Sequence, residues 1–354
     1  MPCIEAAVCH FFGEPFVIKD IEIRTPIDGK VEVNLATCPI CHSDITKARD
    51  YWVGYLRAVY GHEAVGTVTA IGLNAEDVRI GDKVVVTLIR SCGTYLNCSA
   101  ARPTNCEETY DGDQGTDKTA NGGKLHQEMA CGGFAEKVVV NESQVVVMPD
   151  GISMKEALLV AYRVITNIST FVDTSKVHPS QDVVVIGAGG VGLNAIKRTK
   201  VAGVLHIVAI GMKPSKLTIV REFEATDGLL VSTDEPWNEA KGLMERDADA
   251  ITVDLATVYD QASFHLAKGG DVIIVSMPSS NTISNYEEAN CAASGQGMIE
   301  AKISEVVIKH NIPWMVDLYT QGLLKLDELV SGTWSLDQIN KAIADTKTGV
   351  PNLM

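Results

Sequence analysis

Long apolar runs are missing from this chain of 354 residues. None approaches the roughly 20 residues that span a bilayer, and the N-terminus enters a strand-like pattern without a secretory signal. Basic residues are also scarce, because 30 Lys and Arg face 45 Asp and Glu, for a formal net charge of −15. Nucleic acids and anionic membranes attract basic surfaces. The charge therefore argues against both as partners.

Cysteine is too scarce and too clustered for a secreted disulfide scaffold, with nine residues in the whole chain. In a cytosolic chain, clustered cysteines mark metal sites more often than disulfides. We therefore expect a cytoplasmic protein with metal-binding cysteines.

The length and texture of the chain predict two domains. As far as Pro149 the sequence reads as short β-rich segments separated by turn residues, which is typical of a small antiparallel barrel or sandwich. From Met154 strands alternate with helices, which predicts a parallel doubly wound sheet. The last part, about 300–354, is mostly helical. The Gly/Asp/Thr-rich stretch 107–132 is predicted to be a long loop, forming a lobe or lid.

The strands are expected at 31–35, 65–71, 83–86 and 137–140 in the first part, and at 183–186, 206–210, 250–253 and 271–275 in the second. The strand 183–186 leads directly into a G-x-G-x-x-G motif, and a helical pattern follows. In this context the motif is typical of dinucleotide binding, since its backbone can approach a pyrophosphate at a helix N-terminus. Alone it could be a tight turn between strand and helix. The predicted cofactor-binding residues here are Gly187, Gly189, Gly190, Val191 and Gly192.

Two clusters carry metal-type side chains. The first is Cys38-Pro39-Ile40-Cys41-His42-Ser43-Asp44, followed by Gly61-His62-Glu63. Cysteine and histidine from separate points of a barrel can converge on one zinc, although each alone could be an ordinary core residue.

The second cluster is Cys92, Cys98 and Cys106, with Tyr95 where a fourth cysteine would fall. This resembles a four-cysteine structural zinc site that lacks one ligand. We expect it to hold zinc weakly or not at all.

The order of these features, with the segments 61–66 and 81–84, resembles that of the zinc-dependent alcohol dehydrogenases of the medium-chain dehydrogenase/reductase superfamily. The resemblance covers essentially the whole chain. It implies an α/β fold, with a GroES-like β-barrel catalytic domain (1–162 and 298–354) and a Rossmann doubly wound parallel sheet domain (163–297). It also implies a homo-oligomer, a dimer or tetramer formed through the sheet edge of the cofactor domain.

The resemblance implies a role for each residue of the first cluster. Cys41 and His62 would be catalytic zinc ligands, and Glu63 a carboxylate able to approach the metal. Ser43 would take the proton of the alcohol, and His42 would lie near the cofactor pyrophosphate. Zinc in that family acts as a Lewis acid, while hydride passes to or from the nicotinamide.

The sequence departs from the family where chemistry is expected. Tyr162 stands at the third zinc ligand, Asn167 at a glycine beside the nicotinamide, and Thr46 at the proton-relay histidine. Ser276 replaces a glycine, and the segment 348–354 lacks the arginine that grips the pyrophosphate. These changes predict a weakened or absent catalytic zinc, with Tyr162 as a candidate acid.

The cofactor prediction is NADP, with NAD as the alternative. The acidic residue that would bond the ribose 2′-hydroxyl is replaced by Gly211, and Lys213 and Lys216 follow. They could meet a 2′-phosphate or simply be solvated helix-start lysines.

The sequence thus predicts an NAD(P)-dependent oxidoreductase of the alcohol dehydrogenase type acting on a small-molecule carbonyl, alcohol or other electrophilic acceptor. Two alternatives remain open. One is a zinc-free NADPH reductase of activated C=C or C=N bonds, whose activity would survive chelators. The other is a degenerate, non-catalytic paralogue with a binding or structural role.

Overall fold

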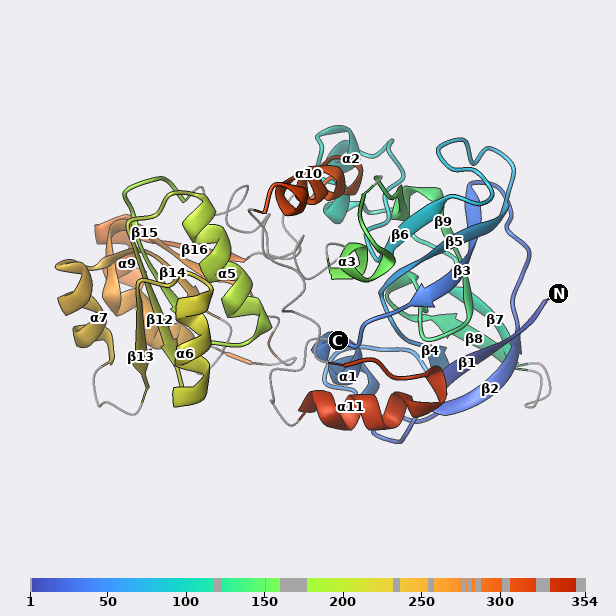
Figure 1. The fold of residues 1–354 in the computed structure, drawn as a ribbon, viewed down its shortest axis with the longest axis horizontal. Coiled ribbons are helices and arrows are strands. Elements are labelled where there is room, and N and C mark those ends of the chain that lie inside the picture. The colour runs from blue at the N-terminus through green and yellow to red at the C-terminus, as the bar shows by residue number, and fades with distance from the viewer. Residues whose placement is uncertain are drawn as a thin grey trace. The chain divides into compact units, whose positions relative to one another are not determined.

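The computed structural model describes residues 2–117, 123–149, 151–159, 177–231, 236–253, 258–275, 278, 282–283, 288–300, 306–322 and 332–347. The chain divides into two compact units (Figure 1). Unit 1 comprises Met1–Tyr162 and Val307–Met354, and unit 2 comprises Arg163–Val306. Each unit has its own sheets and its own core.

Unit 1 contains a closed barrel of five short strands in the order β1-β2-β7-β8-β4. The strands are β1 (Cys3–Cys9), β2 (Val17–Glu22), β7 (Asp113–Asp117), β8 (Gly123–Gln127) and β4 (Ala58–Val59). The prediction of a long loop or lid over 107–132 is therefore wrong. This stretch supplies two paired barrel strands, whose polar side chains gave no alternating apolar pattern.

A second, five-stranded sheet in unit 1 runs in the order β10-β6-β5-β3-β9. Its strands are β10 (Val145–Val147), β6 (Lys83–Thr87), β5 (Glu63–Ile71), β3 (Lys30–Thr37) and β9 (Lys137–Asn141). Valines at alternate positions point inward and form one core cluster. The four strands predicted in this half of the chain are confirmed. They are rich in valine and other β-branched residues, which favour strands, and β9 also alternates in burial.

The helices of unit 1 are α1 (His42–Ala48), α2 (Leu96–Ser99), α3 (Met154–Leu159), α10 (Ile308–Thr320) and α11 (Ile339–Lys347). Although α11 is the last described helix, it joins the core of the N-terminal barrel (Figure 1). Its apolar face contributes Ile339, Ala342 and Ile343 beside Phe16. The Asn340 amide fixes the register, since it accepts from the backbone N of Phe16 at 2.9 Å and donates to its carbonyl at 2.8 Å.

Unit 2 is built on a six-stranded parallel sheet in the order β13-β12-β11-β14-β15-β16. The strands are β11 (Asp182–Ile186), β12 (His206–Gly211), β13 (Asp227–Leu230), β14 (Ala248–Val253), β15 (Leu266–Ile274) and β16 (Gly297–Glu300). Numbered by their order in the chain, the strands lie in the order 3-2-1-4-5-6, which is the Rossmann order. Successive strands are added toward one edge of the sheet from β11 to β13 and toward the other edge from β14 to β16. The predicted fold class, a GroES-like domain with a Rossmann domain, is confirmed.

Helices cover both faces of this sheet, so its central strands are buried throughout. They are α5 (Gly190–Val201), α6 (Pro214–Glu222), α7 (Pro236–Met244), α8 (Tyr259–Ala262) and α9 (Glu288–Ser294). Figure 1 shows α5 and α6 on one face and α7 on the other. The two faces are used because each crossover is right-handed: the chain moves toward one edge of the sheet as far as β13 and then crosses back to β14 beside β11.

The passage from unit 2 back to unit 1 differs from the expected boundary at residue 298. That residue lies inside β16, which pairs in parallel with β15 and so belongs to the sheet. The two units meet in the chain at Val306 and Val307 instead.

Candidate active site

Cys41 is held at the start of α1 by a reciprocal cap. It occupies the N-cap with extended backbone, and its N–H donates to Oδ2 of Asp44 at 3.1 Å. Asp44 is the third residue of the helix, where an acidic side chain can reach back to the cap. The Cys-x-x-Asp spacing therefore orients the thiol before any ligand is present.

His62 and Glu63 are placed by the turn that enters β5. Gly61 has φ +88°, and a Cβ there would come within 2.7 Å of Phe134 and 2.9 Å of Sγ of Cys38. Only glycine satisfies both this space and this backbone conformation. The side chains of His62 and Glu63 that follow are each 2% exposed.

These elements bring Cys41, His62 and Glu63 together, with one ligand atom of each lying within 4.8 Å of the others. Nε2 of His62 lies 3.2 Å from Oε1 of Glu63, and its Nδ1 lies 3.0 Å from Oδ1 of Asp44. Thiolate, imidazole and carboxylate are all donors that zinc accepts. The three residues therefore fit a zinc ion.

Asp44 fixes the state of His62. Burial by itself lowers the pKa of this histidine, but the charge and hydrogen bond of Asp44, with further bonds to Cys41 and Glu63, raise the pKa well above its ordinary value. The bond to Asp44 keeps Nδ1 protonated, so Nε2 is the ring nitrogen that can bind a metal once its own proton is displaced. The sequence analysis missed Asp44 as a site residue. Its position three residues after Cys41 indicates a helix cap, but nothing in the sequence indicates its bond to His62.

The remaining residues of the first motif lie on α1. Ser43 Oγ is 3.6 Å from Sγ of Cys41, and His42 is exposed in the first turn. Oγ1 of Thr46 donates to the backbone carbonyl of His42 at 2.8 Å. The hydroxyl of Thr46 is thus bonded within its own helix. Tyr162, Asn167, Ser276 and the segment 348–354 lie outside the described residues.

The three cysteines of the second cluster also converge, and their sulfur atoms all lie within 4.8 Å of one another. Hydrogen bonds from the Thr94 hydroxyl and from the backbone of Tyr95 and Thr94 lower the pKa of Cys92 to about 6. Tyr95 is half exposed. A closed structural zinc site needs four protein donors, and the described residues supply three.

The predicted dinucleotide turn follows β11. Gly187 has φ +112° and its N–H donates to the Ile210 carbonyl at 2.9 Å, while a Cβ on Gly192 would lie 1.7 Å from the Gly187 carbonyl oxygen. Gly189 is the N-cap of α5, with nothing within 4 Å of a Cβ position. Gly190 and Val191 begin the helix. This arrangement suits a pyrophosphate at the helix N-terminus.

Gly211 ends β12, the strand beside β11 in the sheet. A Cβ at this position would lie 3.3 Å from side-chain atoms of Ala188 and Leu217. A larger residue would therefore fit only if these two side chains shifted slightly. Lys213 is the exposed N-cap of α6, and Lys216 is partly exposed in its first turn. Both lysines therefore lie just beyond the strand end at which the ribose is expected.

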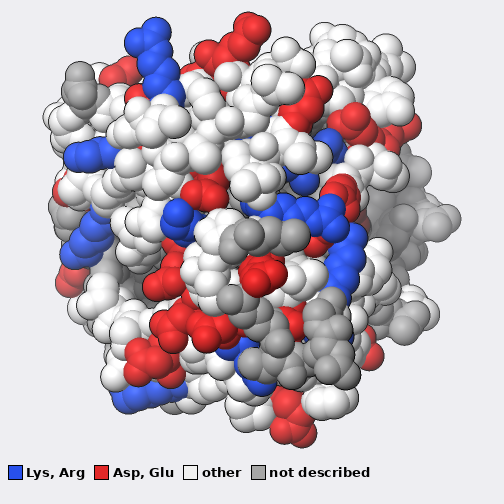
Figure 2. Space-filling view, turned by 90° about the vertical axis from the view of Figure 1, so that its right-hand side faces the viewer, with Lys and Arg blue, Asp and Glu red and all other residues white. Residues whose placement is uncertain are grey.

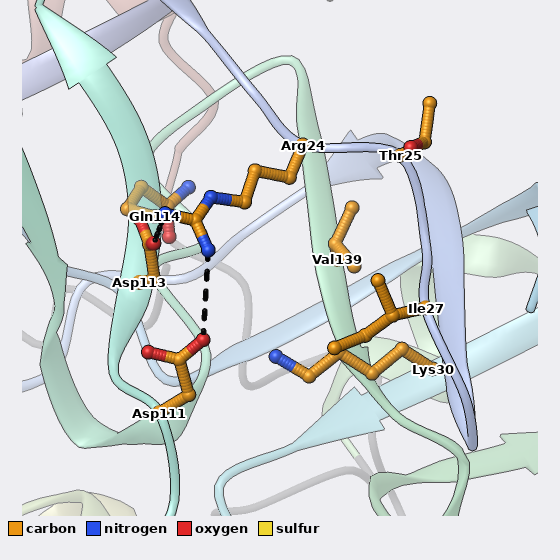
Figure 3. A pocket seen from close by; sticks show the side chains of 8 residues that line it. All are labelled: Arg24, Thr25, Ile27, Lys30, Asp111, Asp113, Gln114 and Val139. Atoms are coloured by element: carbon orange, nitrogen blue, oxygen red, sulfur yellow. Dashed lines mark ion pairs between the residues drawn. The ribbon is translucent and has the colours of Figure 1, made fainter.

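A pocket elsewhere in unit 1 contains none of these residues. It has an empty volume of about 320 Å³ and is lined by Arg24, Thr25, Ile27, Lys30, Asp111, Asp113, Gln114 and Val139. Figure 3 shows Arg24 reaching between the two aspartates, and it pairs with Asp113 at 2.6 Å. The Arg24 guanidinium thus lines the pocket while it is paired with carboxylates.

Comparisons with known proteins agree with this geometry. Residues 27–150 match the family described as the alcohol dehydrogenase GroES-like domain. The NDMA-dependent alcohol dehydrogenase of Amycolatopsis methanolica is 28% identical, over 98% of this chain and 96% of its own length. Two crystal structures are each 26% identical. One is an alcohol dehydrogenase zinc-binding domain protein from Burkholderia ambifaria (TM-score 0.92, covering 99% and 97% of the two chains), and the other is benzyl alcohol dehydrogenase from Acinetobacter calcoaceticus (0.91, 100% and 98%).

The fold, the dinucleotide turn and the donor cluster thus define a nicotinamide-dependent oxidoreductase with a GroES-like and a Rossmann domain. With the comparisons, residues 27–150 match the alcohol dehydrogenase GroES-like domain, and the chain over nearly its whole length is similar in sequence and structure to alcohol dehydrogenases. Within the described part of the chain, no helix has both the length and the apolar character of a membrane span.

Proposed function

We propose that this protein transfers hydride between NADP(H) and an alcohol or carbonyl compound at a metal held by Cys41, His62 and Glu63. The observation that carries the proposal is the convergence of these three donors within 4.8 Å around a histidine whose tautomer Asp44 selects. Burying charged side chains of this kind lowers the stability of the fold unless their charges are compensated. A bound cation supplies that compensation.

The residues of the chain divide the work as follows. A bound zinc would supply a Lewis acid that polarises the substrate oxygen. Ser43, in the first turn of α1 beside Cys41, holds the substrate proton through its hydroxyl. The hydroxyl of Thr46 is already donated to the His42 carbonyl, so the relay beyond Ser43 lacks the group that a histidine would provide.

The metal in this proposal is labile. Tyr162 stands where the resemblance implies a second thiolate, and Glu63 replaces it as the third donor. Carboxylate is a harder ligand than thiolate, so the site holds zinc less tightly than a site with two cysteines.

For the cofactor, Gly211 removes the carboxylate that would repel a 2′-phosphate, and Lys213 and Lys216 supply positive charge. The turn 187–192 takes the pyrophosphate. These features support NADPH over NADH.

The protein is proposed to act as a cytoplasmic homo-oligomer on a small molecule. On the described part of the unit 1 face in Figure 2, acidic and basic side chains are intermixed, with no continuous basic patch.

The test is metal analysis and turnover before and after dialysis against a chelator. We expect about one zinc per chain at the Cys41 cluster, lost on dialysis together with NADPH-linked carbonyl reduction, and restored by added zinc. Cys41→Ser should behave like the dialysed protein, whereas Cys3→Ser, an exposed cysteine, should behave like the parent.

Two outcomes would replace the proposal. Undiminished reduction of an enone or imine after complete metal removal would favour the zinc-free reductase, with Tyr162 as the proton donor. NADPH binding without turnover of any acceptor would favour the non-catalytic paralogue.

A further inference from the structure

The proposed reaction makes no use of the cysteine lobe, defined here as residues 90–108. Its three thiols form one cluster, with Sγ of Cys92 and Cys98 3.8 Å apart and Cys106 within 4.8 Å of both. An ion bonded to thiolates at about 2.3 Å can bridge sulfur atoms that are up to about 4.6 Å apart. The spacing therefore suits a single shared ion.

The lobe offers this ion sulfur donors alone. The cluster holds no histidine or carboxylate among the described residues. Tyr95, at the position of a fourth cysteine, is half exposed and contacts Cys92 through its backbone N–H, which donates to Sγ at 3.4 Å. A neutral phenol is a poor ligand for zinc near neutral pH, because its pKa is near 10. Zinc would have to complete its tetrahedron from solvent.

Hydrogen-bond donors of the protein converge on one of the three sulfur atoms, that of Cys92. Sγ of Cys92 accepts from the backbone N–H of Thr94 at 3.4 Å, from the Thr94 hydroxyl at 3.3 Å and from Tyr95. Donors of this kind stabilise a thiolate. These donors offset part of the negative charge that Cys92 carries when it shares a monovalent cation with Cys98 and Cys106.

The frame of the lobe is built without a metal. The amide of Asn97 donates to the Asn105 carbonyl at 3.0 Å and to the Glu107 carboxylate at 3.1 Å, which joins the segment around Cys98 to the segment around Cys106. Arg90 forms an ion pair with Glu108 at 3.1 Å. These contacts keep the three thiols together when no ion is bound.

We infer that the lobe is a three-thiolate site for Cu(I) in place of a structural zinc site. Soft thiolate ligands select Cu(I), a closed-shell monovalent ion that accepts three sulfur donors and needs no fourth ligand. Zinc with the same ligands keeps an open position and remains exchangeable. Replacing one cysteine by Tyr95 thus changes which ion the lobe prefers.

The experiment is an anaerobic titration of the reduced, metal-free full-length protein with Cu(I), in competition with a coloured Cu(I) chelator. It is performed in the Cys41→Ser background, so that the other cluster does not contribute. Thiolate-to-copper absorption in the ultraviolet reports the ligands. We expect one Cu(I) per chain and a loss of about 100-fold in affinity for Cys98→Ser and for Cys106→Ser. Cys291→Ser, a cysteine of unit 2, is the matched control and should match its parent.

A parallel titration with zinc tests selectivity. The parent should release zinc to a moderate chelator, whereas Tyr95→Cys should hold one zinc tightly, because it completes a four-cysteine set. Circular dichroism verifies that each variant is folded. A chelator-resistant zinc in the parent that Cys98→Ser loses would overturn the inference. So would a Cu(I) affinity that neither Cys98→Ser nor Cys106→Ser changes. None of these readouts depends on hydride transfer.

Discussion

Asp44 is 1% exposed and shares its carboxylate among three groups: Nδ1 of His62 and the backbone N–H groups of Cys41 and Gly61. Asp44→Asn keeps the size and shape of the side chain but removes its negative charge. The amide then no longer holds the proton on Nδ1 of His62. We expect zinc affinity, measured by competition with a chromophoric chelator, to fall about 10–100-fold. Asp20→Asn, an exposed aspartate on β2, is the control. Unchanged zinc affinity in folded Asp44→Asn would show that Asp44 only caps the helix.

At the same scale, cofactor choice depends on the residues after β12. Lys213→Ala and Lys216→Ala should each weaken NADPH binding but not NADH binding, since a charge-assisted hydrogen bond contributes about 1.5–3 kcal/mol. Gly211→Asp should shift the preference toward NADH, with some loss of affinity because Ala188 and Leu217 leave little space. Fluorescence titration measures both cofactors. Lys200→Ala, at the exposed end of α5, is the control. Equal binding of NADPH and NADH by the parent would contradict the proposal.

At the scale of elements, Glu156 links α3 to α10. It accepts from the backbone N–H of Ser153 at 2.6 Å and from the Tyr319 hydroxyl at 2.8 Å, and the Ser153 hydroxyl is the first cause of its lowered pKa. A carboxyl group whose pKa is lower in the folded state stabilises the fold at pH values above its unfolded pKa, near 4.5. This stabilisation is lost as the pH falls through the folded pKa.

Glu156→Gln should therefore lower the free energy of unfolding by about 0.5–2 kcal/mol at pH 7. The difference should shrink as the pH falls from 4.5 through the lower pKa of the native carboxyl, because the unfolded state takes up its proton first. Urea denaturation at several pH values measures this, and Glu76→Gln, an exposed glutamate in the same unit, is the reference. A deficit that stays constant with pH would exclude the charge of Glu156 as its cause.

At the scale of the whole molecule, the metal cluster belongs to unit 1 and the dinucleotide turn to unit 2. The two binding functions should therefore be separable. Cys41→Ser should lose zinc and keep NADPH affinity within about twofold, a change under 0.5 kcal/mol. Gly192→Val should lose NADPH binding, since its side chain meets the Gly187 carbonyl, and should keep zinc. Zinc analysis and NADPH titration on both variants check this.

The control for the second variant is Gly242→Ala in α7, where a Cβ meets nothing within 4 Å. Loss of zinc in Gly192→Val, with unit 2 still folded, would mean that the units do not bind their ligands independently.

The sequence by itself determined eight of the strands and the dinucleotide turn. The strand 183–186 is apolar at every position, and its successor glycines are required by local backbone geometry, so short-range patterns suffice. The same holds for the alternating valines of β9.

Only the tertiary structure decided which distant residues meet. Strands β7 and β8 carry Asp, Gln and Lys, and they became barrel strands because β2 and β4 provide partners for their backbones. The position of β16 was likewise set by pairing with β15. Asp44 became part of the candidate metal site because the turn at Gly61 brings His62 to it across 18 residues of chain. Hydrogen bonds between remote segments leave no periodic trace in the sequence, and so these three features could be found only in the folded chain.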